Sequence, residues 1–215
     1  GEIKRLKRVG VEVKMGVSEV RIPKQKRSAE KRQAIIQAGF ALFCEKGYYR
    51  TNTAEIAKAA GVSTGIVYSY FHDKKDILKE AVHLYVVRLE KEFSVFFNAD
   101  MKKKELPSVI EGFVDAVVSS HTMNRKAHNE FLALALLDGD IGNLFEEFEN
   151  RILYRLSQKL IVAGYEEKHI MEKLRIAYGI VEQFCHDQMN GKIREEERKY
   201  SGQLIISTIL SLLES

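Results

Sequence analysis

Proline is scarce in this sequence of 215 residues, which contains only Pro23 and Pro107. Because proline interrupts the interior of a helix, a chain with so few prolines can be helical over nearly its whole length. No segment long enough for a strand shows the alternation of apolar and polar residues that predicts one. These two absences favour an all-α fold.

Long hydrophobic runs are also missing, since no uncharged apolar segment reaches the length of about 18 residues that a membrane span needs. The basic N-terminus has no apolar segment behind it, so no signal peptide is expected. The two cysteines, Cys44 and Cys185, lie far apart and outside any C-x-x-C spacing, which predicts reduced thiols rather than a disulfide or a metal pair. We therefore expect a cytoplasmic protein without cofactor, metal or membrane segment.

Charge is distributed unevenly along the chain. Residues 1–75 contain 16 lysines and arginines against 7 acidic residues, a net charge of +9. Residues 76–215 contain 18 against 23, a net charge of −5. A basic first third joined to an acidic remainder predicts that the first third binds a polyanion.

The helical pattern divides the chain into three parts. Residues 1–27 are basic and without periodicity, and we predict a flexible arm or a non-native leader. Residues 28–75 are predicted to form a helix-turn-helix head, and residues 76–215 a helical-bundle body. Apolar spacing, caps and breakers place the helices as follows: roughly 29–46, a short helix after Asn52, another after Ser63, then 75–99, 107–120, 127–138, 143–163, 167–190 and 195–214.

Two short helices joined by a tight turn occupy residues 47–75. Asn52 is a good N-cap with Glu55 three residues later, and Ser63 caps the second short helix. Gly61 lies in the turn between them, where a residue without Cβ reaches conformations that are costly for others. In a helix-turn-helix, the second helix enters the major groove by its N-terminal end. Small residues at that end, Thr64 and Gly65, allow a close approach to DNA.

Residues 28–78 resemble the N-terminal domain of the tetracycline-repressor (TetR) family of bacterial transcriptional regulators. The match is unbroken over about fifty residues, from Ile35-Ile36 and Leu42-Phe43 through Ala60-Gly61-Val62-Ser63 to Tyr70-Phe71. The resemblance implies an all-helical homodimer that binds a palindromic operator in double-stranded DNA. It also implies a ligand cavity within the body and repression rather than activation. We further predict that a small, largely apolar effector binds in this cavity.

The resemblance also assigns DNA contacts by position. Asn52 and Thr53 would lie at the start of the first short helix. Lys74 matches a phosphate-binding lysine, and Tyr68 and Tyr70 would offer hydroxyl groups on the exposed side. The full set of predicted contacts is Asn52, Thr53, Ser63, Thr64, Gly65, Tyr68, Tyr70 and Lys74.

The body offers candidates for the effector pocket. Tyr178, Glu182 and His186 recur every fourth residue and therefore share one face of a helix. They would either orient a ligand or form an ordinary hydrogen-bonded pair within the helix or between subunits. We favour the second interpretation. Further candidates are Tyr85, Arg88, Phe113, Val117, Phe131 and Tyr154, although plain core is an alternative for most of them. His121 and His128 are expected to face solvent, and no metal is expected because no two body histidines are four residues apart.

The C-terminal helix, with Leu204, Ile205 and Ile209, is strongly apolar at the end of the chain and predicts a second subunit as its partner.

Two classes of function other than a transcriptional regulator are considered. An all-helical enzyme would need catalytic or cofactor motifs that the sequence lacks. A helical adaptor with a purely structural helix-turn-helix would have a neutral head rather than a strongly basic one.

Overall fold

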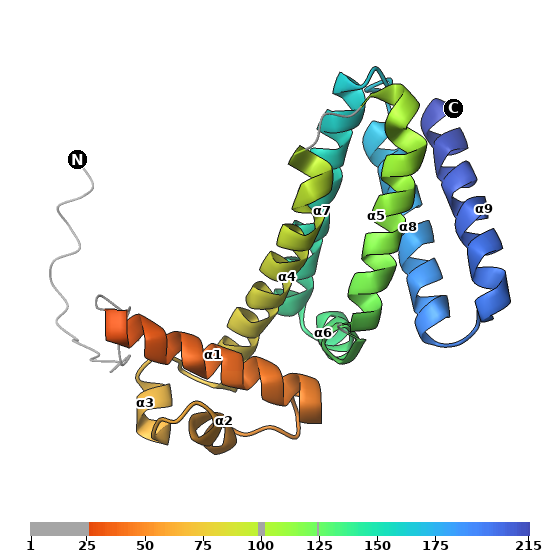
Figure 1. Cartoon of the computed structure of the whole chain (residues 1–215). Coiled ribbons are helices and arrows are strands. Elements are labelled where there is room, and N and C mark those ends of the chain that lie inside the picture. Colours follow the sequence, from red (N-terminus) through yellow and green to blue (C-terminus); the bar gives the residue numbers. More distant parts are fainter. Residues whose placement is uncertain (1–25, 99–101, 124) are drawn as a thin grey trace, which may run out of the picture.

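The computed structural model describes residues 26–98, 102–123 and 125–215, and every regular element in these ranges is helical (Figure 1). The predicted all-α fold is confirmed, and the arm predicted for residues 1–27 falls almost entirely outside the described residues. The elements are α1 (Lys26–Lys46), α2 (Thr53–Ala59), α3 (Thr64–Tyr68), α4 (Lys74–Asn98), η1 (Lys103–Glu105), α5 (Leu106–Met123), α6 (Arg125–Leu137), α7 (Gly139–Val162), α8 (Ile170–Met189) and α9 (Glu195–Glu214).

These helices agree closely with the predicted ones, with one clear exception. The segment Asp138–Asp140 was expected to form a loop, but it starts α7. The carboxylate of Asp138 accepts a hydrogen bond from the backbone N–H of Asp140, which satisfies one of the free donors at the helix start.

The head consists of α1, α2, α3 and the start of α4, and α1 lies across both short helices (Figure 1). Its core is built from fully buried side chains of each helix, among them Phe43, Ile56, Val67 and Ile77. The predicted caps are present. Asn52 and Glu55 form a reciprocal capping box at the start of α2.

Gly39 allows α1 and α4 to approach closely. A Cβ atom at Gly39 would lie only 2.6 Å from Cγ2 of Ile77, a side chain that is fully buried. Glycine costs about 1 kcal/mol relative to alanine inside a helix, and the tight contact explains why a glycine is used here. The start of α4 is therefore packed directly against α1.

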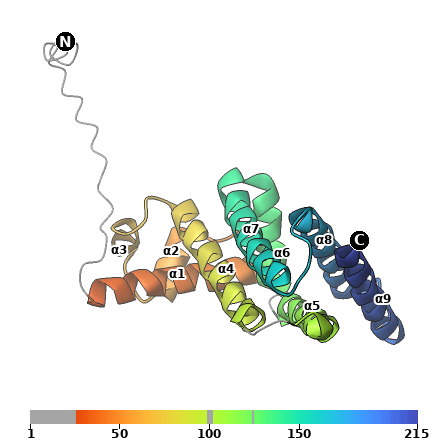
Figure 2. The same ribbon diagram turned by 90° about the horizontal axis from the view of Figure 1, so that it is seen from above.

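The body is a bundle formed by the rest of α4 and helices α5 to α9. The single helix α4 runs from the head along α7, and α9 lies at the edge of the bundle farthest from the head (Figures 1 and 2). None of the helices in the described ranges combines the length and hydropathy of a membrane span. Cys44 and Cys185 are free thiols.

Two sets of contacts besides α4 itself join head and body. On α6, Phe131 packs against Phe40 of α1 with ring centroids 5.7 Å apart, and Glu130 accepts a hydrogen bond from the backbone N–H of Tyr48. At the start of α7, Asp138 and Asp140 pair with lysines of α4. The ion pairs are Lys75–Asp138 at 2.8 Å, Lys75–Asp140 at 3.1 Å and Lys79–Asp140 at 2.8 Å.

Candidate functional site

One surface of the head carries most of the predicted DNA contacts. Ser63, Gly65 and Tyr68 of α3 and its cap are exposed, and the Tyr68 side chain is 53% exposed. Asn52 is exposed and Thr53 and Thr64 are partly exposed at the starts of α2 and α3. The start of α3 therefore offers small side chains and one tyrosine to a partner. Whether they touch DNA stays a prediction.

Tyr70 does not lie on this surface, and the prediction that it offers an exposed hydroxyl is wrong. Helix α3 ends at Tyr68, so the chain has left the helix before Tyr70 and its ring turns inward. The residue is only 6% exposed, and its hydroxyl lies 2.7 Å from the hydroxyl of Ser28 on α1. Tyr70 therefore anchors α1 to the turn after α3.

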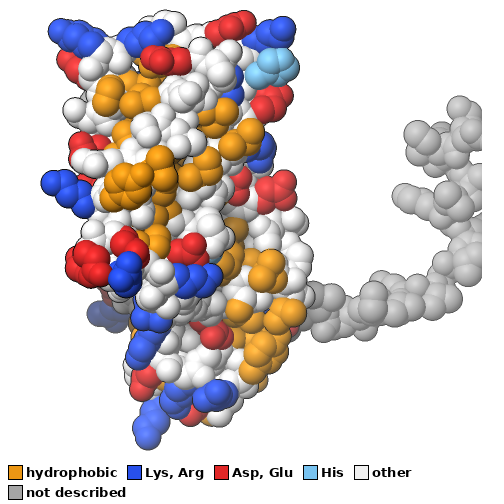
Figure 3. All heavy atoms as spheres, turned by 90° about the vertical axis from the view of Figure 1, so that its right-hand side faces the viewer, with side chains coloured by type: hydrophobic (Ala, Val, Ile, Leu, Met, Phe, Trp, Pro, Cys, Tyr) orange, Lys and Arg blue, Asp and Glu red, His pale blue; other side chains and the backbone are white. Residues whose placement is uncertain are grey.

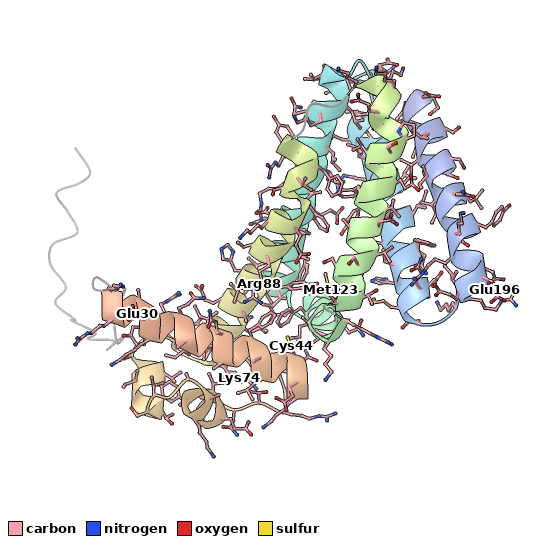
Figure 4. All side chains as sticks on the ribbon, in the orientation of Figure 1. Glu30, Cys44, Lys74, Arg88, Met123 and Glu196 are labelled. Carbon is pink, nitrogen blue, oxygen red and sulfur yellow. The ribbon has the colours of Figure 1, made fainter. Side chains whose placement is uncertain are left out.

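Lys74 lies beneath α1 within the head (Figure 4). Its ammonium donates hydrogen bonds to the carbonyl oxygens of Tyr48 and Thr51, at 2.7 and 2.8 Å, and lies 4.2 Å from the centre of the Tyr48 ring. Burial lowers the pKa of Lys74. An ammonium has three N–H donors, so one remains for the phosphate contact that the resemblance predicts, and that contact is still a prediction.

A cavity of about 380 Å³ lies in the body between α4, α5, α6, α7 and α8. Much of its wall is aromatic or aliphatic, which suits an apolar molecule. An adjoining apolar cavity of about 70 Å³ shares three wall residues with it, Phe113, Ile152 and Tyr178. Six of the predicted pocket residues line the larger cavity: Tyr85, Phe113, Val117, Tyr178, Glu182 and His186.

Three other predicted pocket residues lie elsewhere. Arg88 is exposed where α4 passes α1 (Figure 4), with its guanidinium 5.0 Å from the centre of the Phe40 ring. Phe131 is fully buried between head and body, in edge contact with Tyr85. Tyr154 is 60% exposed because it faces outward from α7. The prediction that these residues line the pocket is therefore corrected: Arg88 makes a surface contact, Phe131 belongs to the core, and Tyr154 is exposed to solvent.

Four polar groups meet at one end of the larger cavity, and two of them were missed from the sequence. His121 and His128 were expected to face solvent, but both are buried. His121 Nε2 lies 3.2 Å from Glu182 Oε2, and His128 Nε2 lies 2.9 Å from His186 Nε2. Glu182 and His186 come from α8, whereas His121 ends α5 and His128 starts α6. We call these four residues the histidine cluster.

The charges in the histidine cluster influence one another. Burial opposes protonation of His121, but the hydrogen bond and charge of Glu182 outweigh it and raise the pKa of His121 above its ordinary value. For His128, burial and the neighbouring His121 lower the pKa to about 4. Burial favours the neutral form of Glu182, yet the hydrogen bond from His121 and the surrounding histidines hold its pKa below the usual value.

Comparison with known proteins decides the family. Residues 35–81 match the model of bacterial regulatory proteins of the tetR family. The chain is 30% identical over 166 residues to the fatty acid metabolism regulator protein of Bacillus subtilis, covering 67% of this chain and 83% of that protein. The chain belongs to the tetR family. Membership confirms the predicted class of function, a helix-turn-helix transcriptional regulator rather than an enzyme.

Further regulators are similar to this chain in sequence or in fold. The regulator HbdR of an Aromatoleum strain is 36% identical over 140 residues, which are 65% of this chain and 52% of HbdR, so the match spans about half of that relative's length. BetI of Yersinia pestis is 32% identical over 138 residues, 62% of this chain and 68% of that protein. A solved tetR-family regulator from Mesorhizobium loti superimposes with a TM-score of 0.69 at 22% identity, over 87% of this chain and 98% of that chain, and shows the shared fold.

Proposed function

We propose that this tetR-family protein is a cytoplasmic repressor that binds a palindromic operator as a homodimer and leaves it when an effector fills the cavity of the body. The boundary between a DNA-binding head and a ligand-binding, dimerising body is placed near residue 75. The single observation that carries the proposal is the position of the cavity. Its wall is built partly from α4 and α6, and both of these helices pack against the head.

The DNA contacts are proposed for the surface at the starts of α2 and α3. Thr64, Gly65 and Tyr68 would face base edges in the major groove, while Asn52, Thr53 and Ser63 would lie against phosphates. Lys74 would add its one remaining N–H to a phosphate. Tyr70 is retained only as the residue that anchors α1, because its hydroxyl already pairs with Ser28.

The coupling between cavity and head is proposed to run along α6 as well as α4. A ligand in the cavity contacts Leu132 and Ala135 of α6. The same helix packs Phe131 on Phe40 and holds the backbone N–H of Tyr48 through Glu130. A shift of α6 is therefore transmitted to the end of α1. Two heads in successive major grooves must stay about 34 Å apart, so a displacement of a few ångströms would remove one head from register.

The effector is proposed to have an apolar body and one polar end. The smaller cavity and the aromatic wall would surround the apolar part, and the histidine cluster would face the polar end. One relative is named a fatty acid metabolism regulator. Molecules with an aliphatic chain are therefore the first class to test.

The dimer is proposed to form through α8 and α9. Figure 3 views this side of the molecule and shows hydrophobic side chains gathered along its middle, flanked by charged ones. Large apolar side chains on these helices are exposed in the single chain, namely Ile176, Tyr200 and Leu204. A four-helix contact between two copies would remove them from water, and it would set the distance between the two heads.

The proposal is tested by selecting binding sites from a pool of random duplexes and measuring affinity for the enriched sequence by fluorescence anisotropy. A palindromic sequence is expected. Aliphatic acids and esters are then screened by thermal shift, and each ligand is titrated with and without operator. We expect the operator to weaken ligand binding by the factor by which the ligand weakens DNA binding. No enriched duplex would refute DNA recognition, and equal ligand affinities in both titrations would refute the coupling.

A matched pair of variants tests the route along α6. Glu130→Ala removes the acceptor of the Tyr48 N–H and should reduce the coupling factor without abolishing either binding event. Glu166→Ala removes an exposed glutamate beyond the end of α7, remote from the head, and should leave coupling unchanged. Equal coupling factors in the two variants would show that α6 does not carry the signal.

A further inference from the structure

We propose that the histidine cluster, His121, His128, Glu182 and His186, is a binding site for a divalent transition-metal ion of the zinc type. The ion would lie in the wall of the larger cavity, where α5, α6 and α8 meet. Metal binding as such does not depend on the proposed function, whereas its effect on DNA binding does.

The four side chains converge as ligands of one ion do. Each offers one donor atom, and the four donor atoms lie within 4.8 Å of one another. With zinc–nitrogen and zinc–oxygen bonds of about 2.0–2.2 Å, tetrahedral ligands lie roughly 3.3–3.6 Å apart. The separations of 3.2 Å between His121 and Glu182 and 3.9 Å between His186 and Glu182 bracket this value. Rotamer adjustments of less than about 1.5 Å would bring the widest pair to the ideal separation.

The surrounding groups orient the ligands in the way that metal sites require. His121 Nδ1 lies 2.8 Å from the carbonyl oxygen of Val117. A carbonyl only accepts, so Nδ1 carries the hydrogen and the Nε2 lone pair of the neutral ring points into the cluster. Such an outer contact fixes the ring of a metal-binding histidine.

Without a metal ion, each of the two short contacts in the cluster needs a hydrogen between its two atoms. His121 Nε2 donates to Glu182 only when both ring nitrogens carry hydrogen, whereas the neutral ring with its hydrogen on Nδ1 turns a lone pair toward the carboxylate oxygen. The two Nε2 atoms of His128 and His186 are 2.9 Å apart, so only one hydrogen fits between them. A cation at the centre would replace these hydrogens and accept one lone pair from each of the four side chains.

The donor set also selects the metal. Three imidazoles and one carboxylate favour Zn²⁺, Co²⁺ or Ni²⁺ over Mg²⁺ and Ca²⁺, which prefer oxygen ligands. The chain contains six histidines, and three of them meet here from three different helices. No other group of three or more histidine, cysteine or acidic side chains in the part of the chain that the structure describes meets the same distance criterion.

The position of His128 would link the ion to the head. His128 lies in the first turn of α6, and within the next three residues the same helix contacts Tyr48 and Phe40 through Glu130 and Phe131. Drawing His128 toward Glu182 and His186 on α8 would pull α6 toward the body. If the proposed function holds, loading the site changes DNA affinity through this helix.

The test uses full-length protein without a polyhistidine tag, stripped with chelator and dialysed. Zn²⁺ is titrated by calorimetry, and Co²⁺ is titrated by visible absorption, since tetrahedral Co²⁺ absorbs strongly. We expect one ion per chain with submicromolar affinity.

Glu182→Gln and His186→Gln preserve the size of the side chain. Each should weaken metal binding by more than about 100-fold, which is more than the loss of a hydrogen bond to a ligand would cause. The matched control His83→Gln, an exposed histidine of α4, should bind as the wild type does. Circular dichroism verifies that every variant is folded.

Absence of stoichiometric binding by the folded wild-type chain would overturn the metal site. Equal affinities of wild type, Glu182→Gln and His186→Gln would overturn it as well. The selected duplex separates this inference from the proposed function. DNA binding without metal binding refutes only the site, whereas metal binding without any selected duplex refutes only the regulator.

Discussion

The clearest energetic prediction concerns Lys74, whose ammonium joins the loop between α1 and α2 to the start of α4. Replacement by methionine keeps the apolar stem and removes the charge. The carbonyl oxygens of Tyr48 and Thr51 then lose their donor, and Thr51 is almost fully buried. Lys74→Met should therefore loosen the head even in the absence of DNA.

The size of the effect follows from the contacts. A hydrogen bond to a charged group contributes about 1.5–3 kcal/mol, and Lys74 makes two, together with a cation–π contact to Tyr48 worth about 0.5–1 kcal/mol. Burial lowers the pKa of Lys74, so the cost of removing its ammonium from water offsets part of this gain. We expect a net loss of about 2–3 kcal/mol, or roughly a 30- to 150-fold increase in local opening.

Hydrogen exchange of the α2 and α3 amides measures this opening directly, because it reports local as well as global unfolding. Lys58→Met is the matched control, since Lys58 is an exposed lysine on α2 that has no charged partner within ion-pair distance among the residues that the structure describes. The same variants are compared in a salt titration of DNA affinity. A lost phosphate contact lowers the slope of log affinity against log salt by about one.

Protection of α2 and α3 that is the same in Lys74→Met and Lys58→Met would refute the structural role of the ammonium. A lower salt slope with unchanged amide protection would instead assign Lys74 to phosphate alone. Loss of protection with an unchanged slope would assign it to the fold alone.

Three further perturbations probe packing, recognition and assembly. Gly39→Ala places a methyl group against Ile77 and should lower the free energy of unfolding by about 1–3 kcal/mol in urea titrations; Gly65→Ala, which meets no such contact, should not. Tyr68→Phe should lower affinity for the selected duplex several-fold in anisotropy without changing the unfolding midpoint, and unchanged affinity would remove Tyr68 from the interface. Leu204→Asp should produce monomers in analytical ultracentrifugation, and a persistent dimer would place the interface elsewhere.

The head was well predicted from the sequence because its signals are local. Asn52 with Glu55, and Ser63 ahead of α3, are capping patterns whose partners lie three residues away. Tyr70 was misplaced because α3 ends at Tyr68, after which helical periodicity no longer predicts direction. A tyrosine hydroxyl also gives no sign in the sequence of whether it meets solvent or, as here, Ser28.

The body was harder to predict because its polar groups meet across helices. Glu182 and His186 share a face of α8, and the sequence identified them by that spacing. His121 lies 61 residues before Glu182 and reaches it only through the packing of α5 on α8. A spacing of four residues identifies histidines that share one helix, so it could not identify a cluster whose side chains come from three helices.

The ion pairs between the starts of α4 and α7 have a consequence for how ionic strength acts on this regulator. Lys75 and Lys79 meet Asp138 and Asp140 at the surface, where dissolved salt screens their attraction. If the proposed function holds, dissolved salt would act twice: it would weaken binding to the duplex, and it would loosen the ion-paired contact between the starts of α4 and α7. The change in DNA affinity caused by an effector should then decrease at high ionic strength more steeply than effector binding itself does.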